Sequence, residues 1–552
     1  MKILLINPPI EDFFFTPQRA YPTGILSLGT ILKKDGFEIK ILNCLESYKK
    51  EPLKFPRDFY YLKRYYQPNN SPFRLFSNFY RFGLGESEIL KVVKDFRPQL
   101  VGISANFTCY LDSTFYVADL IKRNNKKIII VVGGHAATVQ PEIFLDNHNI
   151  DFVIRGEAEF AFLKLCRILR GRERDFIDGV CYRTKKNKFV ISNVALVENL
   201  NSLPIINREL IDYKKYIFKG SISTALYTSR GCNRKCSFCA IRQPFRFRSV
   251  KNVLAEVEYC YKLGIRHFNF EDDNVNLNPY FEQLLDSLIE RFEGKIKISF
   301  MNGLLSLRLN KRMLSKLIRA GLTHLDLSMV SSSNVLRKNM QRTENIRNIF
   351  AIANFLASSR ILTTVHFIIA YPKQRFKDIV RDIKLLARKK VLAGPSIFYL
   401  VIESDIFKRL SINTSDYKFF RSSTAYFDKY ISRDRIFLIL YFSRIVNFIK
   451  ELTLKLKIKK VRLMSLLEKQ VGSLLVNNNY LFSHTKLDRL VIGMLLLKKL
   501  LKEKLIYRII LQKKDRGFLY HFIKEEFVRK KDVEILLNNL TVEGLNGEIL
   551  RI

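Results

Sequence analysis

Three cysteines near the middle of the 552-residue chain have a spacing that favours one kind of chemistry. Cys232, Cys236 and Cys239 stand four and three residues apart, and Phe238 comes just before the last of them. Iron–sulfur clusters are held by cysteine thiolates that converge on one point, and a loop this short can gather three of them. A cluster of four irons would keep one iron without a protein ligand. Such an open metal position can bind and activate a small molecule.

A structural zinc ion is the main alternative for this loop. Closed zinc sites need a fourth cysteine or histidine ligand. The next cysteine, Cys260, lies roughly twenty residues farther on in a helical pattern, and no histidine falls between it and Cys239. A disulfide fits less well, because the spacing groups three thiols rather than a pair.

The other cysteines and the first residues of the chain give expectations about location. Cys44, Cys109, Cys166 and Cys181 show no framework spacing, which favours a reducing, cytoplasmic compartment. The apolar part of residues 1–9 is too short for a signal peptide. No run in the sequence reaches the roughly eighteen apolar residues of a membrane span.

The formal charge of +42 is large and indicates an affinity for anionic partners. Nucleic acid, an anionic membrane surface and small anionic ligands would all attract such a chain. The Lys and Arg residues are spread along the whole chain rather than gathered into one segment. This distribution favours a generally basic protein over a nucleic-acid-binding one and leaves peripheral membrane contact open.

Alternating strand and helix patterns indicate an α/β doubly wound sheet in residues 1–190. Short apolar runs there predict buried parallel strands. The predicted strands span residues 2–7, 37–43, 100–104, 127–132 and 151–154. Residues 48–85 interrupt them as an insertion rich in Phe, Tyr, Lys and Arg, which either covers a ligand or packs its rings on the sheet edge.

The alternation restarts after a linker over residues 191–220 and continues to residue 410. The predicted strands span residues 225–228, 265–270, 295–301, 323–329, 363–370 and 394–399. The cysteine loop follows the first of these strands, and acidic residues follow the second. Residues 411–552 predict an α-helical C-terminal domain, whose helices we expect to pack on the core. It could instead cap the active site, bind a partner or lie on an anionic membrane surface. Its helical patterns span residues 437–456, 461–475 and 487–500.

The Cys-x3-Cys-x2-Cys spacing with an aromatic residue at Phe238 resembles the signature of the radical S-adenosylmethionine (SAM) superfamily. The resemblance implies a partial (β/α)6 barrel and a [4Fe-4S] cluster on Cys232, Cys236 and Cys239, with SAM chelating the open iron. One electron from the cluster would then cleave SAM to methionine and a 5′-deoxyadenosyl radical. The implied SAM contacts are Phe238, Asp272, Asp273, Ser331 and Ser333. An acidic side chain there would supply a counter-charge to the SAM ammonium group.

A second set of short motifs falls in order before the cysteine loop. The motifs are Asn7-Pro8-Pro9, Pro22-Thr23-Gly24, Val101-Gly102-Ile103-Ser104, Gly133-Gly134-His135 and Arg155-Gly156-Glu157-Ala158-Glu159. The set is similar to the flavodoxin-like cobalamin-binding domain that precedes many radical SAM domains. The implied cobalamin contacts are Asn7, Ser104, Gly133, Gly134 and Glu157. Glycines after a strand let the backbone approach a bulky ligand. Residues 8–19 lack the histidine that binds cobalt in cobalamin domains of the methionine-synthase type.

Three positions depart from the radical SAM pattern. Val330 stands where many members have Glu, and Lys373 replaces a turn glycine. Glu403-Ser404-Asp405 stands where relatives have Pro-Gly-Thr. These departures leave open a degenerate corrinoid-binding sensor or carrier without catalysis.

Together, the two resemblances imply a cobalamin-dependent radical SAM methyltransferase that transfers a methyl group to an unactivated centre. The implied partners are a small-molecule or lipid-like substrate and an electron donor such as flavodoxin or ferredoxin. A cobalamin-dependent radical cyclase or rearrangement enzyme stays open as an alternative. A transfer-RNA methylthiotransferase is a third reading, but such enzymes resemble a layout with three further cysteines in the N-terminal domain, and the cysteines there are widely spaced.

Overall fold

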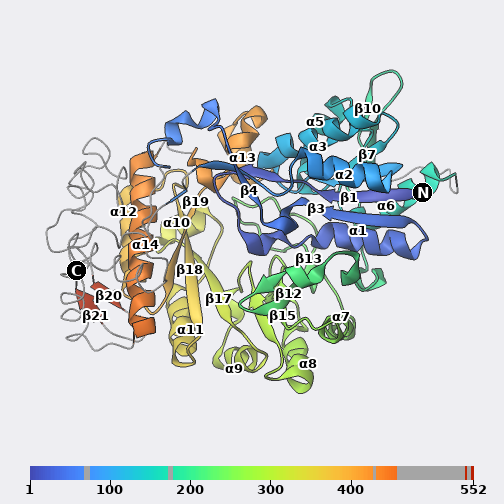
Figure 1. Ribbon diagram of the computed structural model, residues 1–552. Coiled ribbons are helices and arrows are strands. Elements are labelled where there is room, and N and C mark those ends of the chain that lie inside the picture. Colours follow the sequence, from blue (N-terminus) through green and yellow to red (C-terminus); the bar gives the residue numbers. More distant parts are fainter. Residues whose placement is uncertain are drawn as a thin grey trace, which may run out of the picture.

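The computed structural model of the chain describes residues 1–66, 75–76, 78–171, 178–426, 430–456, 541–543 and 549–551 (Figure 1). The helices predicted at residues 461–475 and 487–500 lie outside these ranges. None of the helices within the described ranges has both the length and the apolar character that crossing a membrane requires.

The N-terminal part contains a seven-stranded sheet whose parallel strands have the flavodoxin-like order. Its strands are β1 (Lys2–Asn7), β3 (Glu38–Asn43), β6 (Leu100–Ser104), β7 (Ile129–Gly133), β8 (Phe152–Ile154), β9 (Val180–Arg183) and β10 (Phe189–Val190). Across the sheet the order is β10-β9-β8-β7-β6-β1-β3, with parallel pairing from β3 to β8. The parallel strands thus follow the order 2-1-3-4-5, in which ligands bind at the carboxyl ends beside the first strand. The predicted doubly wound fold is confirmed.

Helices cover both faces of this sheet because its central strands are apolar on both sides. The helices are α1 (Thr23–Lys34), α2 (Glu86–Phe96), α3 (Leu111–Asn124), α4 (His135–Val139), α5 (Pro141–Asp146) and α6 (Ala158–Leu169). Ile3 and Leu5 of β1 pack in one cluster with α1 and α6, whereas Leu4 and Ile6 pack in another with α2 and α3. A strand buried on both faces gives a continuous apolar run, which is why β1 was predictable.

The aromatic insertion packs against a helix near the end of the described chain. Within the insertion, strands β4 (Lys50–Leu53) and β5 (Phe79–Phe82) form a small antiparallel sheet with β2 (Ile10–Asp12). Phe59, Tyr65 and Tyr66 are buried. The Tyr65 and Tyr66 rings have centroids 4.1 Å and 5.5 Å from that of Phe437 in α14 (Arg433–Leu456). The rings of the insertion therefore pack into protein, but on α14 rather than on the edge of the main sheet.

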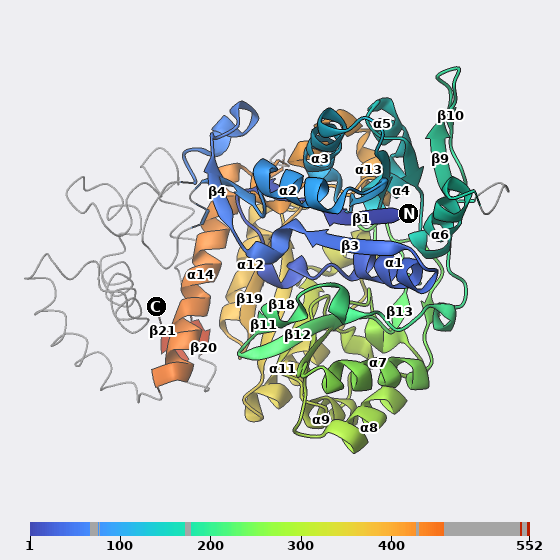
Figure 2. The ribbon, with the colours of Figure 1, turned by 45° about the vertical axis from the view of Figure 1, so that its right-hand side comes forward.

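The second domain is the predicted partial barrel of six parallel strands. The strands β12 (Ser221–Leu226), β15 (His267–Phe270) and β16 (Lys297–Phe300) form one sheet with β11 (Ile217–Phe218), and β17 (His324–Val330), β18 (Leu362–Ile369) and β19 (Leu392–Ile397) form another. A bridge between Ile298 and Leu322 links the two sheets. Helices α7 (Val250–Lys262), α8 (Phe281–Phe292), α9 (Lys311–Arg319), α11 (Ile346–Ser358) and α12 (Phe376–Ala387) lie outside the strands (Figure 2).

Helix α14 completes the barrel edge at its last strand. It runs beside α12 and β19 (Figure 1, Figure 2). The Asn447 side chain accepts a hydrogen bond from Ala393 N at 2.7 Å and donates one to Ala393 O at 2.8 Å. The buried Lys450 ammonium donates to the carbonyls of Leu386, Lys389 and Val391. These contacts give backbone groups of β19 and of the end of α12 the partners that a further strand or cap would supply.

Replacing Lys373 with glycine is expected to stabilise the fold by roughly 0.5–1 kcal/mol. Lys373 is exposed and has a φ of 65°, so the turn has the left-handed backbone that glycine adopts most readily. Left-handed backbone strains a residue with a Cβ, and glycine removes that strain at some cost in chain entropy. Chemical denaturation would measure the gain. Lys373→Ala is the control, because alanine keeps the Cβ, and an equal gain in both variants would contradict the explanation.

Candidate active site

The cysteine loop leaves the barrel at the carboxyl end of β12, through the short strand β13 (Ser229–Arg230). Gly231 then turns the chain with a φ of 80°. A Cβ at this position would lie 2.3 Å from the carbonyl oxygen of Pro244. Only glycine therefore fits the point at which the loop begins.

The three predicted cluster cysteines lie near one another. Burial raises the pKa of the Cys239 thiol, and the nearby Cys236, Asp273 and Cys232 raise it further. Each sulfur also accepts an N–H group: Cys232 from the Asn274 side chain at 3.3 Å, Cys236 from Arg342 at 3.7 Å, and Cys239 from the Ile241 backbone at 3.5 Å. Within the described residues, no three His, Cys, Asp or Glu side chains gather tightly enough for a single metal ion. A four-iron cluster has a different requirement, because each thiolate binds its own iron.

Several contacts with the far side of the barrel fix the loop. The Ser237 hydroxyl and the Tyr371 hydroxyl lie 2.9 Å apart, and Ser237 N donates to Met340 O at 3.2 Å. Ile406 N donates to Ser237 O at 2.8 Å. Phe238 is partly buried against an apolar cluster that includes Val330. The structure thus places Phe238 in packing beside the loop, and its contact with SAM stays a prediction.

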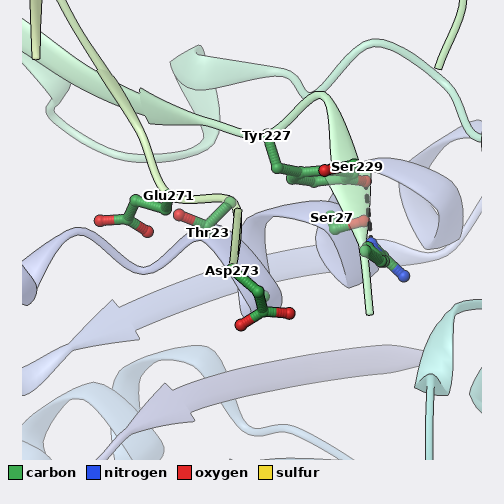
Figure 3. A pocket seen from close by; sticks show the side chains of 8 residues that line it. Thr23, Ser27, Tyr227, Ser229, Glu271 and Asp273 are labelled. Carbon is green, nitrogen blue, oxygen red and sulfur yellow. Dashed lines mark hydrogen bonds between the residues drawn. The ribbon is translucent and has the colours of Figure 1, made fainter. Parts of the chain in front are cut away.

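A cavity of about 230 Å³ lies between the two domains, next to this loop (Figure 3). Its lining comes from α1 of the first domain and, in the second domain, from the residue after β12, from β13 and from the segment after β15. The lining residues are Thr23, Gly24, Ser27, Tyr227, Ser229, Arg230, Glu271 and Asp273. The cavity therefore combines hydroxyl groups, a guanidinium and two carboxyl groups at the carboxyl ends of barrel strands, where barrel enzymes hold their ligands.

The three acidic residues after β15 point in different directions. Asp272 is 3% exposed and accepts hydrogen bonds from Thr228 N at 2.9 Å and from the Ser229 hydroxyl at 2.5 Å. Asp273 and Glu271 instead line the cavity. Burial raises the pKa of Asp273 to about 6 and that of Glu271 to about 7. Of the two predicted SAM contacts here, the structure brings Asp273 to the cavity and uses Asp272 to hold the strand ends. Glu271 was not among the predicted contacts, although it belongs to the same acidic run.

Folding stability is expected to decline between about pH 4.5 and about pH 7 because of Glu271. The folded chain holds this proton more tightly than the unfolded chain. The resulting stabilisation is complete below the usual pKa of 4.5 and is lost as the pH rises through about 7. In Glu271→Gln this part of the decline should vanish.

Denaturant unfolding across this pH range would measure both profiles. Glu290→Gln, on the exposed side of α8, is the control and should keep the wild-type slope. Parallel profiles for the wild type and Glu271→Gln would show that Glu271 does not titrate as described.

The serines after β17 hold the local backbone. Ser331 is buried, and its hydroxyl donates to Asp382 at 2.9 Å. The Ser333 hydroxyl caps helix α10 (Asn334–Asn339) by accepting from Leu336 N. Val330, just before them, has a φ of 54° at a β-bulge. Strained backbone of this kind is concentrated at functional sites. The roles of Ser331 and Ser333 toward SAM stay predictions.

Most of the predicted cobalamin contacts lie at one edge of the first sheet. Asn7, Ser104 and Gly133 stand at the carboxyl ends of the neighbouring strands β1, β6 and β7. Ser104 and Gly133 are direct partners across the sheet. Gly134 has a φ of 121°, and a Cβ there would lie 2.7 Å from the carbonyl oxygen of Ala105. The Asn7 amide already donates to Asn43 at 2.9 Å. This edge is where a doubly wound sheet binds ligands.

Glu157, the fifth predicted cobalamin contact, joins the two domains instead. Its carboxylate pairs with Arg246 at 2.7 Å and accepts a hydrogen bond from Val197 N at 2.7 Å. Glu159, two residues on, pairs with Arg230 at 2.6 Å. Arg230 and Arg246 flank the cysteine loop and pair with each other in the ladder of β13 and β14 (Arg246–Phe247). The acidic motif therefore ties the cysteine loop to the first domain, and a contact of Glu157 with cobalamin stays a prediction.

Two family models match the two domains described above. Residues 226–386 match the Radical SAM superfamily, and residues 78–165 match the B12 binding domain. The chain therefore contains a domain of the Radical SAM superfamily and a B12-binding domain. The cofactors of these domain classes are a [4Fe-4S] cluster with SAM, and cobalamin. The residues present fit them, since three neighbouring thiols adjoin an acidic cavity and the sheet edge carries the glycines of a close ligand approach.

The chain is similar to several curated proteins. It is 29% identical over 311 residues to the cytidylyl-2-hydroxyethylphosphonate methyltransferase of Streptomyces wedmorensis, with 50% of this chain and 55% of the relative covered. It is 34% identical over 287 residues to an uncharacterized methyltransferase of Pyrococcus horikoshii, with 50% of this chain and 54% of the relative covered. It is 23% identical over 397 residues to the anaerobic magnesium-protoporphyrin IX monomethyl ester cyclase of Synechocystis sp., covering 70% and 72%. The chain thus spans about half the length of the two methyltransferases.

Solved structures share the fold. The cobalamin-dependent SAM radical enzyme OxsB with bound aqua-cobalamin has a TM-score of 0.59 at 15% identity, with 98% of this chain and 80% of that chain covered. A second structure is the radical SAM methyltransferase TsrM of Kitasatospora setae, with tryptophan and a SAM analogue bound. Its TM-score is 0.57 at 16% identity, with 73% of this chain and 74% of that chain covered. At these identities the likeness concerns the fold alone.

Proposed function

We propose that this protein is a cobalamin-dependent radical SAM methyltransferase acting on a small molecule. The observation that carries the proposal is the position of the cysteine loop, which adjoins a polar cavity bounded by both domains. When bound, the cluster supplies the electron that cleaves SAM, and cobalamin carries the methyl group. A low-potential donor such as flavodoxin or ferredoxin would supply that electron.

The cavity residues have defined tasks in this proposal. Asp273 lies close enough to Cys239 to raise the pKa of that thiol, and it also lines the cavity. Its carboxylate can therefore face the ammonium group of a SAM molecule bound beside the cysteine loop. Glu271 lines the same cavity, and burial raises its pKa to about 7, so it can donate or accept a hydrogen bond near neutral pH. Helix α1 lines the cavity from the side of the first domain, through Thr23, Gly24 and Ser27.

The ion pairs between the domains would hold the two cofactors at a fixed separation. Arg230 and Glu159 are both largely buried, so their charges interact in a poorly hydrated environment. Arg246 and Glu157 form a second ion pair between the two domains. Radical and methyl chemistry both need the reacting centres held in one geometry, which such a double link provides.

Anaerobic reconstitution of the full chain with iron, sulfide and aqua-cobalamin tests the proposal. After addition of dithionite and SAM, the expected products are 5′-deoxyadenosine and S-adenosylhomocysteine, measured by liquid chromatography and mass spectrometry. The absorption spectrum should show both cluster and corrinoid bands. Corrinoid bands without any 5′-deoxyadenosine would contradict an enzymatic function and would favour a corrinoid-binding sensor or carrier.

A cobalamin-dependent radical cyclase is the second candidate, and one observation favours it. The magnesium-protoporphyrin ester cyclase relative aligns over 70% of this chain, against 50% for the two methyltransferases. A cyclase would form 5′-deoxyadenosine without S-adenosylhomocysteine. The same assay therefore separates the two reactions.

The N-terminal cysteines give no support to a methylthiotransferase. Cys44 and Cys181 lie in one apolar cluster, and Cys166 lies in another cluster on the opposite face of the sheet. Each of these three is 0% exposed. Their thiols therefore belong to the packing of the first domain, which leaves them unable to share a second cluster.

A further inference from the structure

We propose that Arg342 raises the reduction potential of the cluster through Cys236, and that Glu344 lowers it. The inference rests on the [4Fe-4S] cluster of the proposed function. Arg342 is a positioning residue, because it acts on the cluster through the sulfur of Cys236.

Arg342 reaches the cysteine loop from a distant part of the chain. It stands in the segment after α10, and its Nη1 lies 3.7 Å from the sulfur of Cys236, 106 residues away in sequence. The Arg342 side chain is 15% exposed, and Cys236 is 6% exposed. The guanidinium charge is therefore close to a ligand sulfur and poorly screened by water.

Glu344 balances part of this charge. Its side chain is 1% exposed, and its Oε1 lies 2.7 Å from Arg342 Nη2 and 3.1 Å from Arg234 Nη2. Arg234 belongs to the cysteine loop itself, between Cys232 and Cys236. Two guanidinium groups around one carboxylate leave a net positive charge beside Cys236. The same groups tie the loop to the segment after α10.

The sulfurs of Cys232, Cys236 and Cys239 differ in the charge of the group that donates a hydrogen bond to each. Among the described residues, the hydrogen bonds to Cys232 and Cys239 come from the neutral side chain of Asn274 and the neutral backbone of Ile241. The donor to Cys236 carries a full charge. Hydrogen bonds and net charge at the ligand sulfurs are principal determinants of cluster potentials.

The direction of each effect follows from the charge that reduction adds. One electron added to a bound cluster by a low-potential reductant would place additional negative charge on the sulfur ligands, Cys236 among them. The Arg342 guanidinium stabilises that charge and so raises the potential. The Glu344 carboxylate opposes it and so lowers the potential.

Redox titration of the reconstituted full chain, followed by electron paramagnetic resonance of the reduced cluster, tests this inference. Arg342→Gln should shift the midpoint potential downward, and Glu344→Gln should shift it upward. Arg342→Lys keeps the charge and should show a smaller downward shift. Arg319→Gln is the matched control, because Arg319 pairs with Glu293 on the exposed surface and should leave the potential unchanged.

The opposite signs distinguish charge tuning from a structural role. If Arg234, Arg342 and Glu344 only held the loop in place, Arg342→Gln and Glu344→Gln would shift the potential in the same direction or not at all. Either result overturns the inference. If Arg342→Gln fails to retain iron, the other two variants are compared in its place. Arg342→Lys should then lower the midpoint potential and Glu344→Gln should raise it, and shifts in the same direction overturn the inference. A wild-type chain that binds no cluster would instead overturn the proposed function, a result that iron and sulfide analysis identifies before any titration.

Discussion

A chain that carries Cys232→Ala is expected to form no 5′-deoxyadenosine above the level of a protein-free control. Three thiolates hold the proposed cluster, and the loss of one leaves a second iron without a protein ligand. The same substitution should lower the iron bound per chain after reconstitution. Both quantities are measured on the anaerobically reconstituted protein, by mass spectrometry of the nucleoside and by colorimetric iron analysis.

Cys260→Ala is the matched control for this substitution. Cys260 is the residue that a zinc site would need as its fourth ligand, but it is 0% exposed and packs in the core on the buried face of α7. Its replacement should therefore leave the iron content and 5′-deoxyadenosine formation at the wild-type level. Equal losses of metal in Cys232→Ala and Cys260→Ala would contradict the cluster and favour the zinc site.

Replacing Glu256 with alanine is expected to destabilise the fold by about 3–5 kcal/mol, because it leaves two buried guanidinium groups unpaired. Glu256 is 1% exposed, and its carboxylate oxygens lie 2.5 Å from Arg208 and 2.6 Å from Arg248. Arg208 is 0% exposed and also donates to the carbonyls of Ile206 and Ala225. The ion pairs of Glu256 thus connect α7 to the segment before β12 and, through Arg208, to β12 itself.

Denaturant unfolding followed by circular dichroism would measure this loss. Glu258→Ala, on the same helix, removes a partly exposed pair with Arg291 and should cost no more than about 1 kcal/mol. A combined Arg208→Met, Glu256→Leu and Arg248→Met chain should recover much of the stability, since apolar side chains can replace a buried ion network. A loss in Glu256→Ala as small as that in Glu258→Ala would show that the pairs are not buried in solution.

The sequence alone determined the features that depend on neighbours along the chain. Cys232, Cys236 and Cys239 lie within one short loop, so their spacing can be recognised without information from elsewhere in the chain. The apolar runs of β1 and β6 have the same basis, because a strand buried on both faces must be apolar throughout. The doubly wound sheet followed from the repetition of such runs, whereas the partial barrel was implied by the resemblance to the radical SAM superfamily. Both are confirmed.

Only the tertiary structure decided which polar side chains face the cavity and which hold the protein together. Asp272 and Asp273 are adjacent and chemically alike, yet Thr228 and Ser229 occupy the first carboxylate while the second reaches the cavity. Glu157 lies in a motif that predicted a cofactor contact, but its carboxylate forms an ion pair with Arg246.

Arg342 gave no signal in the sequence, because its contact with Cys236 spans 106 residues. A motif fixes residue type and local spacing. The partner of a buried charge is set by which distant elements pack beside it, and that depends on the whole fold.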